Sequence, residues 1–163
     1  QKIEVSLDEA ATAEGRNRYI VDGLPLKTYD CSQITDGYAG LIVATEEGLA
    51  RLGVAKADCV EIAGWGQATD PLLKEGRDIL KPAGAFAAMN AAYEMAGASP
   101  ADVNVAEIHD CFTVMGAIGT EVIGKAGYGE GARYWADANS TKAALAQLGI
   151  MSKVGQQVGW MKS

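Results

Sequence analysis

Short apolar runs and glycine-punctuated polar stretches alternate through the middle of the chain. The run AGLIVA at 39–44 is continuous and apolar, which is typical of a strand covered on both faces. Residues 57–69 predict a second strand, interrupted by Gly64 and Gly66, and residues 103–108 predict a third. Glycines inside a strand indicate a bulge or the close approach of another backbone.

The stretches between these strands carry the signals of helices. Thr45 is a good N-cap for a helix with Glu46 and Glu47 in its first turn, and Gly53 suits the end of that helix. Acidic side chains in a first turn favour a helix because they complement its dipole. This pattern predicts a short helix between the first two strands.

Two further helices follow. The clearest lies within 81–100, where Pro82 suits the first turn and Gly97 marks the end. Another is predicted over 111–127, weakened by internal glycines. The order strand, helix, strand, helix, strand, helix predicts a layered α/β fold, and crossovers of this length imply parallel pairing of the strands.

Composition narrows the classes of function. Hydrophobic residues make up 48% of the 163 residues, which suffices for a substantial core. The net charge of −7 and the lack of a Lys/Arg-rich block argue against nucleic-acid binding. No apolar run is long enough to span a membrane. Three cysteines without a CxxC pair, together with one histidine, do not make a usual zinc set and fit a reducing, cytoplasmic compartment.

The candidate chemistry is concentrated in EIHDCFTV at 107–114. His109 and Cys111 fall where the third predicted strand meets the next helix, and Asp110 is a good N-cap. A thiol at a helix amino end can have a lowered pKa, and an imidazole N–H there can donate to a developing oxyanion. The alternative is structural, because cysteine often behaves as a small buried hydrophobe, and the residues alone slightly favour that alternative.

Three segments in order resemble the thiolase superfamily, in its sterol-carrier-protein-type branch. VAEIHDCF is similar to the HDCF signature of that branch, and DCSQITDGYAGLIVATEEGLARLG is similar to a thiolase segment that leads into a strand and a helix. The helix, turn and strand in AAMNAAYEMAGASPADVNVAEIHDCF match in spacing. The resemblance covers roughly residues 28–130.

The resemblance implies a thiolase-like fold with a mixed, largely parallel sheet covered by helices, here incomplete. It implies that His109 helps to polarise a thioester carbonyl and that Cys111 acts as the acid and base in carbon–carbon bond making or breaking. Ser32 would lie near the pantetheine of a coenzyme A thioester, although a turn residue is an equally good interpretation. The implied partners are acyl-CoA and a second copy or a complementary thiolase chain, with no bound cofactor and no metal.

The sequence also departs from the family. Thiolases form an acyl-enzyme on a cysteine that has no counterpart here, and Cys31 and Cys59 are better interpreted as structural thiols. No Gly-His-Pro motif is present, since His109 is the single histidine. We therefore expect a thiolase-type acyltransferase, or a piece of one, that is inactive alone. A non-catalytic module that binds acyl-CoA or a partner is the alternative, and an independent Cys-His hydrolase ranks last.

The same patterns divide the chain into four parts. The last of them departs from the family pattern, and NSTKAALAQLG within it predicts a capped helix. The parts are a loop-rich amino-terminal segment (1–28), a strand and helix that close the amino-terminal thiolase half (29–53), a partial carboxy-terminal thiolase-like domain (54–131) and a divergent, helical tail (132–163).

Overall fold

The computed structural model describes residues 5–34, 36–71 and 78–137, and its regular elements there are helical. The five α-helices and three 3-10 turns are, in chain order, α1 (Leu7–Ala11), η1 (Thr28–Asp30), α2 (Glu46–Leu52), η2 (Lys56–Asp58), α3 (Ala83–Ala96), η3 (Pro100–Asp102), α4 (Thr113–Val122) and α5 (Gly131–Asp137).

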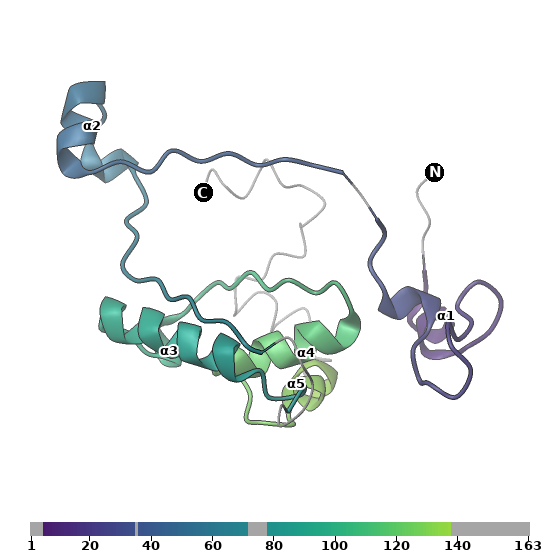
Figure 1. Cartoon of the computed structure of the whole chain (residues 1–163). Helices are drawn as coiled ribbons and strands as arrows, with labels where there is room; N and C mark the ends of the chain where they lie inside the picture. The colour runs from purple at the N-terminus through teal and green to yellow at the C-terminus, as the bar shows by residue number, and fades with distance from the viewer. Residues whose placement is uncertain (1–4, 35, 72–77, 138–163) are drawn as a thin grey trace.

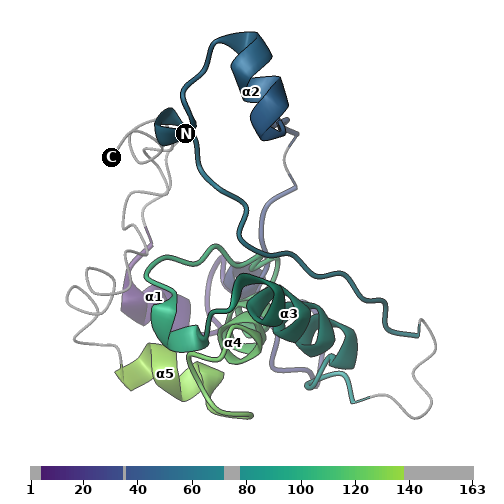
Figure 2. The same cartoon turned by 90° about the vertical axis from the view of Figure 1, so that its left-hand side faces the viewer.

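The molecule is open rather than closed around one core (Figure 1). Helices α3, α4 and α5 gather together, whereas α2 stands apart at the end of two extended arms, residues 36–44 and 59–70. The view turned by 90° shows the same separation of α2 (Figure 2). The chain exposes 13313 Å² of surface, whereas a compact protein of 17.0 kDa exposes about 7,700 Å². Much apolar surface therefore remains uncovered.

The predicted sheet is not formed in the described part of the chain, and this corrects the sequence-based prediction. Residues 39–44, 57–69 and 103–108 carry no strand assignment, and the β-pairing consists of two isolated bridges. Ile42 is 89% exposed and Val60 is 96% exposed, so neither arm is covered as a buried strand is. The prediction was wrong because an apolar run specifies a strand only where neighbours supply hydrogen bonds and cover its faces.

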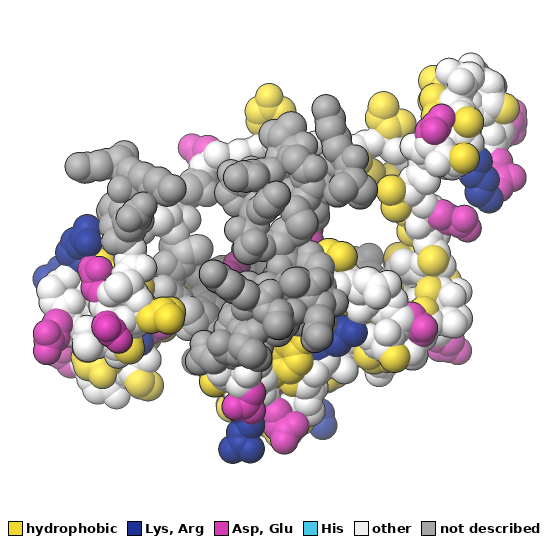
Figure 3. All heavy atoms as spheres, turned by 180° about the vertical axis from the view of Figure 1, so that it is seen from behind, with side chains coloured by type: hydrophobic (Ala, Val, Ile, Leu, Met, Phe, Trp, Pro, Cys, Tyr) yellow, Lys and Arg dark blue, Asp and Glu magenta, His cyan; other side chains and the backbone are white. Residues whose placement is uncertain are grey.

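Hydrophobic side chains stand out from the chain that leads to and from α2 (Figure 3). Those of both arms are largely exposed, and the backbone of residues 36–44 makes no hydrogen bond within the described residues. The exposed large side chains on the arms are Tyr38, Leu41, Ile42, Val43, Val60, Ile62 and Trp65.

The structure confirms several helix caps and helix ends that the sequence predicts. Thr45 caps α2 by accepting a hydrogen bond from the Gly48 amide at 3.1 Å. Gly53 ends α2 with a φ of +67°, and Gly97 ends α3 with a φ of +62°. These ends are confirmed, because each depends on a left-handed conformation that glycine adopts without strain.

The start of α3 has a cap that comes from outside the helix. Pro82 is the N-cap and has no side-chain oxygen, so the carboxylate of Asp70 takes over this role. Its Oδ1 accepts a hydrogen bond from the Gly84 amide at 2.8 Å. The end of the second arm is thereby fixed to the first turn of α3, where a negative charge is favourable.

The second arm approaches α3 very closely at its two glycines. A Cβ atom at Gly64 would collide with the carbonyl oxygen of Ala92, and one at Gly66 would collide with that of Ala88. The close backbone approach predicted for these glycines is therefore confirmed, and its partner is a helix. Alanines on α3 leave room for this contact, because their side chains are small.

Helix α4 forms the centre of the packed region, against α3 and α5. Its Ile118 is the buried hydrophobic residue of the described chain, with 7% of its surface exposed. Trp135 of α5 donates a hydrogen bond to the hydroxyl of Thr120 at 2.9 Å, and the Gly131 amide donates to the carboxylate of Glu121 at 2.8 Å. Polar side chains thus help to join α4 to α5.

Residues 5–32 form a separate small amino-terminal unit organised around one buried amide. Asn17 is fully buried, and its side-chain N–H groups donate to the carbonyl oxygens of Glu9, Ala10 and Thr12. Its side-chain oxygen accepts from the Tyr29 amide at 2.9 Å. The described residues outside α1 and η1 in this unit are loops, and the buried asparagine gives them a fixed arrangement.

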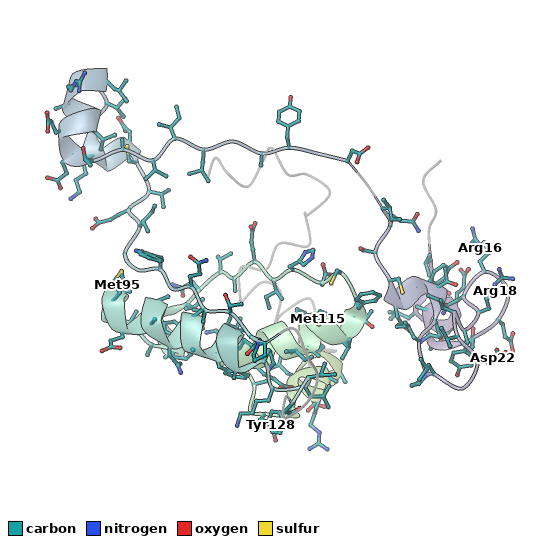
Figure 4. The ribbon with its side chains drawn as sticks, viewed as in Figure 1. Arg16, Arg18, Asp22, Met95, Met115 and Tyr128 are labelled. Carbon is teal, nitrogen blue, oxygen red and sulfur yellow. The ribbon has the colours of Figure 1, made fainter. Side chains whose placement is uncertain are left out.

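Charged side chains of this unit point away from the α3–α5 region. Arg16, Arg18 and Asp22 lie at its far side (Figure 4).

The described part of the chain has no helix long and apolar enough to cross a bilayer. The helix predicted within NSTKAALAQLG, residues 139–149, lies outside the described residues. Helix α5 spans the boundary of the predicted tail at residue 132.

Candidate active site

The site predicted at residues 107–114 lies between an extended segment and α4. His109 is exposed and makes no hydrogen bond or ion pair within the described residues. Cys111 is half-buried and has a free thiol. Neither side chain is fully buried. Both groups are therefore accessible to a ligand that approaches the end of the extended segment.

The helix next to the site starts later than the sequence predicts. Asp110 is not its N-cap, because α4 begins at Thr113 with Phe112 as N-cap. Phe112 offers no side-chain oxygen to the first turn. The start is displaced because Cys111 and Phe112 are used in contacts with the amino-terminal unit, which hold them outside the helix.

Those contacts bring two predicted site residues together across the chain. The Ser32 amide donates a hydrogen bond to the carbonyl oxygen of Cys111 at 3.0 Å. Cys31 and Phe112 form an antiparallel bridge in the adjacent register. In an antiparallel pair, residues directly opposite each other project to the same side. Ser32 and Cys111 are therefore neighbours, although 78 residues lie between them.

A polar contact beside the bridge was not predicted from the sequence. The Thr113 hydroxyl donates to Oδ1 of Asp30 at 3.2 Å. Oδ2 of the same carboxylate accepts from the backbone amide of Lys27 at 2.8 Å and from its ammonium at 3.0 Å. The sequence gives one indication that Asp30 lies near the site, which is its position just before Cys31 and Ser32. It gives no indication that Thr113 is the partner of Asp30.

The environment of Asp30 favours its charged form. Burial works to raise the pKa of the carboxyl group, but the two hydrogen bonds and the charge of Lys27, with the Thr113 hydroxyl, together hold the pKa below its ordinary value. The Asp30 and Lys27 side chains are 17% and 19% exposed. The pair is thus partly desolvated and well bonded.

The thiols of Cys31 and Cys59 each donate a hydrogen bond to a backbone carbonyl oxygen four residues earlier. The Cys31 thiol donates to the carbonyl oxygen of Lys27 at 3.7 Å, and the exposed Cys59 donates to that of Ala55 at 3.6 Å. The sequence predicts buried structural thiols at both positions, but Cys59 is exposed and Cys31 is half-buried. Within the described residues, no group of three His, Cys, Asp or Glu side chains is placed to hold a metal ion.

An apolar pocket lies on another side of the extended segment. Neither His109 nor Cys111 lines this pocket, so it is not part of the candidate site. Its walls come from residues 103–108 and from the facing sides of α4 and α5, with Ile123, Tyr134 and Trp135 among them.

Comparison with known proteins agrees with the segments that carry the candidate site. The family described as "Thiolase C-terminal domain-like" matches residues 66–150, more than half of the chain. The protein therefore belongs to the thiolase superfamily, and the resemblance seen in the HDCF and DCSQITDGYAG segments is confirmed. The match includes His109 and Cys111, and it continues past residue 131 into the part predicted as a divergent tail.

Several curated proteins are similar to the chain. It is 30% identical over 161 residues to benzoylsuccinyl-CoA thiolase subunit BbsB of Thauera aromatica, covering 97% of this chain and 40% of that protein. It is 40% identical over 107 residues to acetyl-CoA acetyltransferase of Methanocaldococcus jannaschii, covering 65% and 27%. It is 35% identical over 134 residues to sterol carrier protein 2 of Bos taurus, covering 80% and 23%. The chain thus spans less than half the length of each of these relatives.

Proposed function

We propose that this chain takes part in thiolase-type acyl transfer on acyl-CoA thioesters, by Claisen condensation or its reverse. The observation that carries the proposal is the Ser32–Cys111 hydrogen bond, because it places two residues that match separate thiolase segments side by side. The similarity to an acetyl-CoA acetyltransferase and to a thiolase subunit supports acyl-CoA as the substrate class.

In this proposal, Cys111 moves the proton and His109 stabilises the charge. The Cys111 thiolate removes a proton from the carbon next to the thioester carbonyl, and the electron pair of the C–H bond becomes an enolate. An N–H of His109 donates to the enolate oxygen. Ser32, opposite Cys111, faces the pantetheine arm. The enolate carbon then attacks the thioester carbonyl of an acyl group carried by a second cysteine, the new carbon–carbon bond forms, and that cysteine leaves as a thiolate. In the reverse direction the carbon–carbon bond breaks, the acyl group passes to that thiolate, and the Cys111 thiol gives its proton to the released enolate.

The acyl acceptor of the full cycle is a cysteine that this chain does not supply in a recognisable context. Removing a nucleophile and its base commonly lowers turnover by many orders of magnitude. We therefore expect the isolated chain to carry out the proton-transfer half-reaction and not the complete condensation. An added amino-terminal thiolase half that holds the nucleophile should restore turnover.

The half-reaction gives a direct test, since enolate formation needs no nucleophilic cysteine. Acetyl-CoA is incubated with the chain in D₂O, and deuterium uptake at the acetyl methyl group is followed by mass spectrometry. Cys111→Ala and His109→Ala should each lower the catalysed uptake by about a hundredfold or more, the range of general acid–base contributions. Cys59→Ala is the matched control, because it removes an exposed thiol far from the site. Uptake that is absent, or that does not change in Cys111→Ala, contradicts the proposal.

One observation favours a second function, that of a non-catalytic module. The arms expose apolar side chains on an unpaired backbone, which suits addition of a strand from a complementary thiolase polypeptide. We commit to that partner because a polypeptide of this family would supply both a strand for the arms and the nucleophilic cysteine of the proposed cycle. Ile42→Lys should abolish capture of the added amino-terminal half. Self-association of the chain that Ile42→Lys abolishes would identify a second copy as the partner instead.

A further inference from the structure

The carboxylate of Asp30 is divided between two parts of the molecule. Its Oδ2 accepts both hydrogen bonds from Lys27, within the turn that η1 forms. Its Oδ1 accepts the hydroxyl of Thr113, the first residue of α4. The amino-terminal unit and the helix that follows the HDCF segment are thus joined through one side chain.

This joint is close to the candidate proton-transfer group. Thr113 is two residues after Cys111, and Phe112 between them is held by the bridge to Cys31. The first turn of α4 receives no cap from the side chain of Phe112. The position of Cys111 therefore depends on the backbone pairing with residues 31 and 32 and on the Thr113 contact beside it.

We propose that Asp30 is a positioning residue for Cys111, and that it acts through the Thr113 hydroxyl to keep the Ser32–Cys111 pairing closed. Lys27 neutralises the carboxylate and orients it, so that the free oxygen faces α4. The role of Cys111 in acyl transfer rests on the proposed function. The positioning itself is a property of the folded chain and is measured without turnover.

A second aspartate provides a matched comparison within the same chain. Asp102 caps η3 in the same way, with its Oδ2 accepting from the amide and the hydroxyl of Ser99. No bond from Asp102 reaches another helix, whereas Asp30 reaches Thr113. Changing Asp102 therefore removes the cap of η3 and the attraction of its charge to Lys125, whereas changing Asp30 removes the cap of η1 and the hydrogen bond to α4.

The experiment follows the pairing and the thiol separately. Hydrogen exchange of the Ser32 amide reports the pairing, and site-resolved alkylation by iodoacetamide, read from the Cys111 peptide by mass spectrometry, reports access to the thiol. Asp30→Ala and Thr113→Val should each speed both reactions by about threefold to tenfold, the range for loss of one hydrogen bond. Thr113→Ser retains the hydroxyl and should restore both rates. Asp102→Ala should leave both rates unchanged.

A double variant decides whether the two residues act together. Asp30→Ala with Thr113→Val should raise the rates no further than Asp30→Ala alone, because Asp30→Ala already removes the contact that Thr113→Val breaks. Fully multiplied effects would overturn the proposal, as would a Thr113→Ser variant that behaves like Thr113→Val. If Asp30→Ala unfolds the amino-terminal unit, Thr113→Val and Thr113→Ser still test the contact from the α4 side. Failure of acetyl-CoA to exchange would remove the proposed function while leaving this result intact.

Discussion

The packed region around α3, α4 and α5 and the two arms that carry α2 have similarly apolar sequences but very different surroundings. In the packed region, glycines and alanines allow backbones to approach, and Ile118 is 7% exposed. On the arms, Ile42 is 89% exposed although its neighbours in the sequence are just as apolar. The difference shows that the helices pack against elements close to them in the sequence. The arms that were predicted as strands would need neighbouring strands, which the described residues do not provide.

The sharpest way to break this comparison is to truncate one isoleucine in each region. Ile118→Ala should lower the free energy of unfolding by about 3 kcal/mol, because it opens a cavity between α4 and its neighbours. Ile42→Ala should change it by less than about 0.5 kcal/mol, as expected of an exposed position. Urea unfolding followed by circular dichroism at 222 nm measures both. Equal costs at the two positions would mean that the arms are buried in solution.

A methyl group added to a glycine should distinguish the arm that contacts the packed region, residues 59–70, from the arm that does not, residues 36–44. Gly66→Ala should cost about 2 kcal/mol, since the new Cβ would press on the backbone of Ala88 in α3. Gly40→Ala has nothing within 4 Å of the new atom and should cost almost nothing. The same unfolding measurement applies. A neutral Gly66→Ala would show that the second arm is not seated on α3.

A single hydroxyl offers a finer test. Tyr93 of α3 donates to the carbonyl oxygen of Ile123, just after α4, at 2.8 Å, and its burial raises the pKa of its phenol. Tyr93→Phe should cost about 1 kcal/mol, the usual net value of one hydrogen bond. Tyr38→Phe on the first arm, where the ring is fully exposed, should have no measurable effect. Thermal unfolding of the two variants in parallel decides the matter.

The smallest expected effect concerns pH at the boundary between the amino-terminal unit and the packed region. The pKa of Asp30 is lower when folded than when unfolded, so its contribution is complete above the unfolded pKa of about 3.9 and is lost as pH falls through the folded value. The protection factor of the Ser32 amide, which removes the intrinsic pH dependence of exchange, should therefore drop below about pH 4. Lys27 and Thr113 are the polar groups that face the carboxylate, and neither titrates there.

Asp30→Asn distinguishes this cause from general acid unfolding. The variant should lose the pH dependence of the protection of the Ser32 amide in that range. The amides of Ile118 and its neighbours should keep the pH dependence of their own protection. The pKa values of Asp78 and Asp102 are also lowered, mainly by hydrogen bonds from Tyr128 and Ser99 respectively, so acid weakens other joints as well. A drop of the same size in Asp30→Asn would assign the effect to those joints.

The features that were predicted from the sequence depend on near neighbours. The cap at Thr45 and the glycine ends of α2 and α3 follow from the preferences of single residues. The glycine at 66 predicted a close approach of backbone, but not that its partner is Ala88 of α3. The apolar runs predicted a sheet that the described residues do not form, because residues such as Ile42 and Val60 form a strand only where other strands pair with them. The late start of α4 at Thr113 also depends on a distant contact.

The same distinction holds for the candidate site. The HDCF segment predicted His109 and Cys111 at the junction of a strand and a helix; the helix forms but starts at Thr113, and residues 103–108 are extended without forming a strand. It could not predict the Asp30–Thr113 contact, because these residues are 83 positions apart and neither has an unusual local pattern. The roles of His109, Cys111 and Ser32 in acyl transfer stay predictions.

The bridge between Cys31 and Phe112 also sets an order of events for a newly made chain. Helices α3, α4 and α5 contact one another within residues 83–137. The bridge instead closes a ring of about eighty residues with α2 on its far side, and the entropy lost in closing a ring increases with its length. Long-separation contacts of this kind form late. We therefore expect the Cys111 thiol to reach its folded position only after the helices have packed together.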